Sequence, residues 1–173
     1  NASIHWPDLM AFKRGFTDPV PAKREARYRE KGIDAYHGAA RFTGPNTIAI
    51  GDESLDARHV LIAAGAEPVE LHIPGEEHLV TNEDFLALPS LPQRIVMVGG
   101  GYIAAEFSHI AARAGAQVTV IQRDSRLLKD FDPDVVGWLM PAFDTLGVDV
   151  RLQTTVTAIE KSDSGFRVHS RCR

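Results

Sequence analysis

The clearest hydrophobic pattern lies in the middle of the chain. Residues 94–98 form a short apolar run rich in β-branched side chains, as expected for a parallel strand covered on both faces. Three glycines follow, and then residues 102–114, which lack Pro and Gly and predict a helix that ends at Gly115. A second apolar run, 117–121, completes a strand–helix–strand unit of roughly 30 residues.

The pattern before this unit is less regular. Residues 6–31 are strongly charged and mostly helical, with an interruption at Asp18–Pro21, because proline removes an amide donor and restricts its predecessor. Strand composition and intervening turns predict a β-meander over three stretches: 33–42, 47–50 and 55–63. The last stretch overlaps an apolar run that ends in small residues at Ala64 and Gly65, where a backbone or ligand could come close.

The flanking segments complete an α/β pattern. Thr81 or Asn82 is expected to cap a short helix that runs to Leu88, within a Pro-rich crossover at 66–92. A helix is predicted from Pro133 to Leu146, capped by Asp132, ended by Gly147 and kinked at Pro141. A third strand at 148–152 and a hairpin at 155–159 and 166–169 follow. The predicted fold is a Rossmann-like domain with a three-layer parallel sheet, together with the meander.

The first turn of the strand–helix–strand unit carries the pattern G-x-G-x-x-A. Gly99 permits a tight turn, Gly101 lets a pyrophosphate approach the backbone, and Ala104 lets the helix pack closely on the strand. The free N–H groups and positive dipole at the helix start would hold the phosphates. A turn that binds nothing is the alternative, but the flanking strands favour a dinucleotide site.

The loop after the second strand indicates which dinucleotide is bound. Gln122 stands where an Asp or Glu usually binds the ribose hydroxyls of NAD, and it has no charge to repel a 2′-phosphate. Arg123 follows directly, with Arg126 and Lys129 nearby, and cations bind phosphate strongly. We therefore expect NADP, with NAD possible. The alternative is an ordinary solvated loop, and two aspartates dilute the basic cluster.

Composition and charge bear on the partners, the location and the metal sites that we expect. The chain has 173 residues and a net charge of −4, which gives no electrostatic support to a nucleic-acid partner. Its N-terminus has no signal-peptide pattern and no apolar run is long enough to cross a bilayer, so no membrane role is expected. Cys172 is the only cysteine, which suits a cytoplasmic location. Among the seven histidines, His72 and His78 are the closest pair and have acidic residues nearby, so a metal site there is an alternative. Scattered surface histidines are the favoured interpretation, and no metal is expected.

Four segments resemble one enzyme family. Val98–Glu106 and Leu61–Gly65, with Ile73–Gly75 and Thr81–Phe85, are similar to the pyridine nucleotide-disulfide oxidoreductases, above all to members like glutathione reductase. Mercuric reductase and dihydrolipoamide dehydrogenase belong to the same family. The resemblance implies that residues 1–66 are part of an FAD-binding domain and that 67–173 are an NAD(P)-binding domain, incomplete at its C-terminus.

The resemblance also implies roles for single residues. Tyr102 would cover the flavin and move aside for the nicotinamide, and Glu106 would lie near the contact between the two rings. Ala64 and Gly65 would form a small-residue turn near FAD, with Ala where Thr is usual. Cofactor contacts are further implied for the matching block, Gly99, Gly100, Gly101, Ile103 and Ala104, and for Gln122, Arg123 and Lys129 as in NADP-using members.

Several parts of the family pattern are missing from this chain. It has no first G-x-G-x-x-G for FAD, no C-x4-C redox pair and no dimerisation domain. We therefore expect a catalytically inactive fragment of a larger homodimeric enzyme, which passes hydride from NADPH to flavin and on to a disulfide-type acceptor. Alternatives are a relative with another small-molecule acceptor (mercuric ion, dihydrolipoamide, a peroxide or oxygen), or a stand-alone nucleotide-binding module without catalysis.

Overall fold

The computed structural model describes residues 4–173, so the first three residues of the predicted 1–66 segment lie outside it. The described residues form two compact units. One contains residues 4–12 and 69–173, and the other contains residues 13–68. The two domains of the sequence analysis stay a prediction. The predicted second domain begins at residue 67, within two residues of Val69, where the chain returns to the larger unit.

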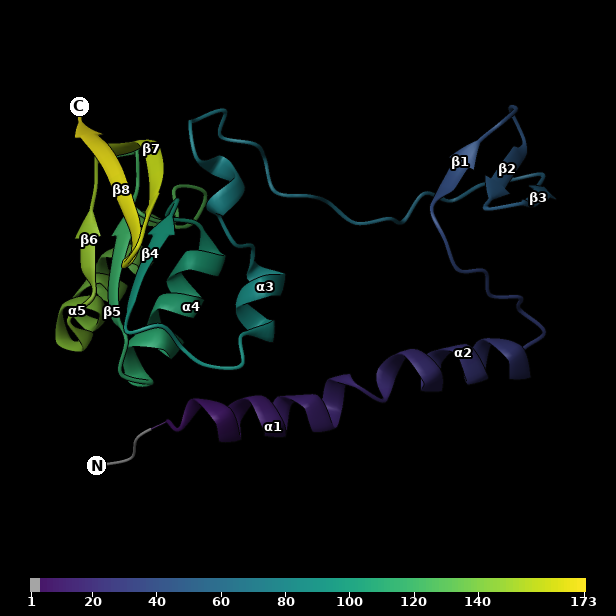
Figure 1. Ribbon diagram of the computed structural model, residues 1–173, viewed down its shortest axis with the longest axis horizontal. Coiled ribbons are helices and arrows are strands. Elements are labelled where there is room, and N and C mark those ends of the chain that lie inside the picture. The colour runs from purple at the N-terminus through teal and green to yellow at the C-terminus, as the bar shows by residue number, and fades with distance from the viewer. Residues whose placement is uncertain (1–3) are drawn as a thin grey trace. The chain divides into compact units, whose positions relative to one another are not determined.

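A parallel sheet lies at the centre of the larger unit (Figure 1). Its strands are β4 (Arg94–Val98), β5 (Gln117–Ile121) and β6 (Asp149–Arg151), in the order β4-β5-β6. Both neighbouring pairs are parallel, as the strand–helix–strand pattern predicts. The third strand is shorter than predicted. β4 is also more open than predicted, since it lies at the sheet edge and its Val96 is exposed.

Alternation along the strands separates two faces of the sheet. Val118 and Val120 point toward the main core, which contains buried side chains of α4 (Tyr102–Arg113) and α5 (Pro133–Leu146). Ile121 points to the opposite face, where a smaller cluster includes residues of a hairpin. The three layers are therefore helices, sheet and hairpin.

The ends of α5 form as predicted. The Asp132 carboxylate accepts hydrogen bonds from the N–H groups of Asp134 at 2.9 Å and Val135 at 3.2 Å. Gly147 ends the helix with a φ of 70°, a left-handed conformation that glycine adopts readily. The helix continues through Pro141.

The hairpin is longer than the sequence predicts. It consists of β7 (Thr154–Ser162) and β8 (Gly165–Cys172), with a register shift between Val156 and Ala158. Its Val156 and Ile159 contribute to the smaller core cluster, which joins the hairpin to the end of β5.

Helices α1 (Trp6–Thr17) and α3 (Asn82–Ala87) share contacts in the larger unit. Trp6 is buried, donates a hydrogen bond from Nε1 to the Leu88 carbonyl oxygen at 2.9 Å, and meets the ring of Phe85 edge-on. Thr81 caps α3 through a capping box with Asp84, as predicted. The N-terminal part of α1 thus belongs to the larger core.

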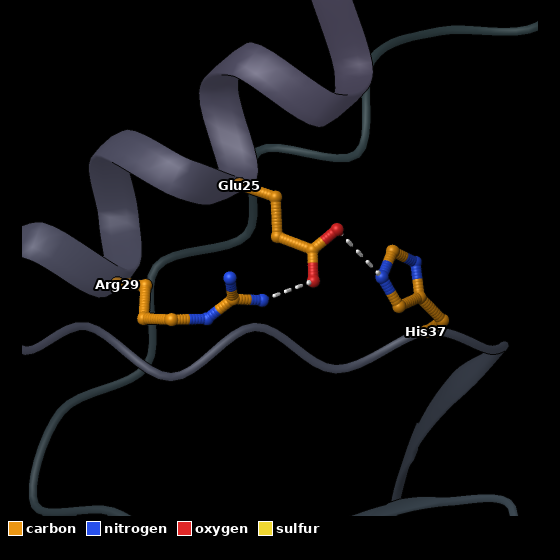
Figure 2. A network of polar contacts seen from close by, with 3 residues as sticks. All are labelled: Glu25, Arg29 and His37. Carbon is orange, nitrogen blue, oxygen red and sulfur yellow. Dashed lines mark hydrogen bonds and ion pairs between the residues drawn. The ribbon is translucent and has the colours of Figure 1, made fainter.

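The smaller unit contains α2 (Val20–Glu30) and an antiparallel sheet of β1 (Ala40–Phe42), β2 (Thr47–Ile50) and β3 (Glu53–Asp56). The predicted meander is confirmed in this order. Glu25 of α2 pairs with Arg29 at 3.3 Å and with His37 at 3.6 Å, and Figure 2 shows these three side chains.

Two predicted strands of this unit are wrong in extent. Residues 33–39 and 57–65 have no regular structure. In the second segment Leu61 is 90% exposed and Ile62 75% exposed. An apolar strand forms only where neighbouring strands take its hydrogen bonds and cover its side chains, and the described residues provide neither for this segment.

Candidate functional site

A groove of about 560 Å³ lies beyond the carboxyl ends of β4 and β5. It is bounded by the glycine turn at 99–101, the loop at 122–131, the start of β7 and the segment 69–73. Ligands of open α/β sheets bind at this edge, because the loops after the strands leave a crevice there. The groove therefore lies where the sequence predicts a dinucleotide.

Gly99 and Gly100 have different structural reasons for being glycine. Gly99 has a φ of 97° and donates its N–H to the Ile121 carbonyl oxygen at 2.9 Å, so it makes the tight turn that the sequence predicts. A Cβ on Gly100 would overlap the Leu127 side chain and lie 3.1 Å from Gln122. The Gly100 carbonyl also accepts the Leu128 N–H at 2.8 Å. Gly100 thus lets the next loop pack against the turn.

Gly101 faces open space at the start of α4. A Cβ built there has no atom within 4 Å, and its φ of −79° is ordinary for any residue. Within residues 4–173 no side chain caps the helix, so its first-turn N–H groups remain available at the groove. An uncapped helix start carries a partial positive charge and binds anions such as phosphate.

The following residues of α4 differ in their access to the groove. Tyr102 lines it and is 58% exposed. Ile103 and Glu106 are exposed on the helix but do not line the groove. Ala104 is half-buried against the main core, and its carbonyl oxygen accepts a hydrogen bond from Ser108 Oγ.

Gln122 has a role that its sequence position does not reveal. It is 7% exposed, and its Oε1 accepts the Arg123 N–H at 3.1 Å. Its Nε2 donates to Asp124 Oδ2 at 3.2 Å and to the Arg126 carbonyl oxygen at 3.4 Å. The side chain therefore shapes the loop from inside, in addition to leaving the strand end without a charge.

The three predicted phosphate-binding cations separate into two groups. Arg123 and Lys129 line the groove. Arg126 does not, because its guanidinium donates to the Phe131 carbonyl oxygen at 2.9 Å and to that of Lys129. Arg126 closes the loop on itself, a function that depends on the folded backbone and has no signal in the sequence.

The segment at 69–73, which the sequence does not mark as part of the site, also lines the groove. The Glu76 carboxylate accepts hydrogen bonds from the N–H groups of Leu71 and of His72, the latter at 2.8 Å. These bonds, of which that from Leu71 has the largest effect, hold the pKa of Glu76 below its usual value. This holds Leu71 at the groove. Beside it, the Ile159 N–H donates to the Pro74 carbonyl oxygen at 2.8 Å, and a Cβ on Gly75 would overlap the Ile159 carbonyl. The turn residues Pro74 and Gly75 were the sequence signal that could have indicated this close contact.

The two remaining predicted site residues, Ala64 and Gly65, belong to the smaller unit and lie in an exposed segment without regular structure. Their predicted place near FAD stays a prediction. Within residues 4–173 no group of His, Cys, Asp and Glu side chains could hold a metal ion. In the same range no helix is both long and apolar enough for a membrane span.

The chain matches a known protein family over most of its length. Residues 12–172 match the family model for pyridine nucleotide-disulphide oxidoreductases. The chain belongs to this family. The resemblance that the sequence motifs suggest is thereby confirmed.

Relatives in this oxidoreductase family carry several names. The chain is 34% identical to a glutathione reductase from Burkholderia cepacia, over 96% of this chain and 37% of the relative. It is 30% identical to dihydrolipoyl dehydrogenase 2 from Haloarcula marismortui, over 97% of this chain and 38% of the relative, and 29% identical to a mercuric reductase from Bacillus cereus, over 94% and 27%. The chain thus spans little more than a third of these proteins at most.

A solved structure has the same fold. The HOCl-induced flavoprotein disulfide reductase RclA from Escherichia coli matches 98% of this chain and 40% of its own, with a TM-score of 0.88 and 24% identity. The predicted α/β, Rossmann-like class is confirmed.

Proposed function

We propose that this chain contributes the nicotinamide-dinucleotide site of a larger FAD-dependent oxidoreductase. The observation that carries the proposal is the uncapped start of α4 behind Gly101, which opens into the groove at the carboxyl ends of β4 and β5. The groove fits a phosphate-bearing ligand there, because within residues 4–173 a Cβ on Gly101 would meet no atom within 4 Å and no side chain caps the helix.

The residues of the groove have distinct tasks in this proposal. The helix start and the turn 99–101 hold the pyrophosphate, and Arg123 and Lys129 bind a 2′-phosphate, which favours NADPH over NADH. Tyr102 lines the groove, where it would shield the flavin until the nicotinamide enters, and Glu106 lies one helical turn later on the same face. Bound NADPH would supply a hydride for FAD, and the residues of this chain would hold the nucleotide in the groove.

The acceptor and the setting are proposals of the same kind. A disulfide-type small molecule fits the names of several relatives, and a cytoplasmic homodimer is our proposal for the intact enzyme. The present chain covers under two fifths of each relative, and we propose that it binds nucleotide weakly and does not catalyse turnover alone.

Reversal of one charge tests the cofactor assignment. Arg123→Glu should lower the affinity for NADPH by at least about tenfold and that for NADH much less, because only NADPH presents a 2′-phosphate to this side chain. The measurement is titration calorimetry of the chain with each cofactor separately.

Arg94→Glu is the matched control. It makes the same charge change at the amino end of β4, whereas the groove lies at the carboxyl end. It should leave both affinities within about twofold, the scale of a screened distant charge. Equal losses for NADPH and NADH in Arg123→Glu would contradict the NADP assignment, and no binding of either cofactor by the unaltered chain would contradict the nucleotide site.

A further inference from the structure

The charges around the groove do not match a site built only for NADP. Arg123 and Lys129 line it, but so do three carboxylates, of Glu70, Asp124 and Asp130. A 2′-phosphate carries close to two negative charges near neutral pH, so each unneutralised carboxylate beside it reduces the benefit of the two cations.

Asp124 is the carboxylate that the fold holds most firmly. Its Oδ2 accepts from Nε2 of the buried Gln122 at 3.2 Å, and its carbonyl oxygen accepts the Gln153 N–H at 3.0 Å. The side chain is half-buried. Asp130 is exposed, and among the described residues no hydrogen bond or ion pair fixes its carboxylate. Asp124 therefore cannot swing away from an anion as Asp130 can.

The nearby cations do not neutralise Asp124. Within the part of the chain that the structure describes, no ion pair of 4.0 Å or less joins its carboxylate to Arg123 or Lys129. Its side-chain partner is the neutral amide of Gln122. The negative charge thus acts on the groove without a compensating positive partner.

We propose that Asp124 is a specificity-determining residue that weakens 2′-phosphate binding and lets the groove accept NADH as well as NADPH. The inference rests on the proposed dinucleotide function. A carboxylate repels the phosphate of NADP but accepts hydrogen bonds from the free ribose hydroxyls of NAD. Within the same loop, Arg123 and Lys129 therefore favour NADPH, and Asp124 favours NADH.

The test isolates the 2′-phosphate with half-molecule probes. Adenosine 2′,5′-bisphosphate and adenosine 5′-monophosphate differ by this one group and do not need a flavin. Asp124→Asn removes the charge and keeps the shape, and the new amide oxygen can still accept from Gln122. We expect the bisphosphate to bind about three- to tenfold more tightly, and the monophosphate to be unchanged or weaker, by titration calorimetry.

Asp130→Asn is the matched control, because it removes an equal charge from the same groove at a carboxylate that is not fixed. It should strengthen bisphosphate binding less than twofold. Three results overturn the proposal: equal gains in both variants, an equal change for both probes, or weaker bisphosphate binding in Asp124→Asn with native circular dichroism. If the unaltered chain and Asp124→Asn bind neither probe, the proposed function fails and the inference with it. If the unaltered chain binds both and Asp124→Asn changes neither, only the inference fails.

Discussion

At the residue scale, the glycines of this chain serve two separate purposes. Gly75 has a φ of 81°, and a Cβ there would overlap the Ile159 carbonyl, so the fold itself requires glycine. Gly101 has an ordinary backbone conformation and empty space in front of it, so the fold does not require glycine there. The requirement at Gly101 would come from a ligand.

Two alanine substitutions should separate these purposes. Gly75→Ala should lower the free energy of unfolding by about 3 kcal/mol or more, because a clash with backbone adds to a left-handed conformation that alanine avoids. Gly101→Ala should leave stability within about 1 kcal/mol but abolish nucleotide binding. Urea unfolding and calorimetry measure the two effects.

Gly137→Ala supplies the reference for both variants. Gly137 lies inside α5 with no atom within 4 Å of a built Cβ, so alanine should raise stability by about 0.5–1 kcal/mol and leave binding unchanged. Normal nucleotide binding by Gly101→Ala would remove the main support for a pyrophosphate at the helix start.

The sequence identifies single residues only where local geometry decides their role. The roles of Gly99 and of Asp132 follow from a turn and a helix start, which short patterns encode. Gln122 and Arg126 act through hydrogen bonds to a loop whose shape depends on contacts with Gly100 and Gln153. No spacing rule in the sequence encodes those contacts. The sequence therefore could not distinguish Arg126, which does not line the groove, from the two cations that do.

At the element scale, a strand is predictable when its partners are near in sequence. The β4–α4–β5 unit forms as predicted because its pattern and turn chemistry agree. Residues 57–65 have an equally apolar pattern and form no strand. An apolar sequence indicates that a segment should be buried, but it does not show whether the fold provides neighbouring residues that bury it.

Short elements of the larger unit depend on carboxylates that accept backbone N–H groups. Glu76 holds the approach to η1 (Glu76–His78), and Asp84 holds the first turn of α3. Bonds from backbone N–H groups, at Leu71 and Thr81 respectively, are the largest cause that lowers the pKa of each carboxyl. A carboxyl group with a lower pKa in the folded state stabilises the protein above its unfolded-state pKa and loses this effect as the pH falls.

The Glu76→Gln variant should therefore show a pH-dependent loss of stability. At pH 7 it should unfold more easily than the unaltered chain, because an amide accepts backbone N–H groups less strongly than a carboxylate. Below about pH 4, toward and past the lowered pKa, the difference should shrink as the native carboxyl is protonated. Chemical unfolding at several pH values measures this, and a constant difference at all of them would contradict the assigned role.

At the scale of the whole molecule, the larger unit is assembled from two distant parts of the sequence. Trp6 and Met10 lie in one core cluster with Phe85 and the residues of α4 and α5. No local pattern in residues 4–12 shows which core they join, and only the contacts place them in the larger unit.

The two tryptophans offer a direct measure of this arrangement. Trp6 is 5% exposed and Trp138 is 79% exposed. A Trp138→Phe variant should show blue-shifted emission that acrylamide quenches weakly, because only the buried indole remains. The Trp6→Phe variant should emit at longer wavelength, be quenched strongly, and lose about 1 kcal/mol of stability with its hydrogen bond to Leu88. Strong quenching of Trp138→Phe would contradict the docking of α1.

The shared core also bears on what happens when the peptide chain is cut. Residues 57–68 run through an exposed stretch without regular structure, the kind of backbone that proteases attack. A cut there leaves one piece that carries Trp6 and Met10 and another that carries Phe85 and the parallel sheet. Because these side chains occupy the same interior, the two pieces separate only if that interior opens. A denaturing gel would therefore show the broken peptide bond as a band shift, whereas under native conditions the cut protein would still migrate as one species.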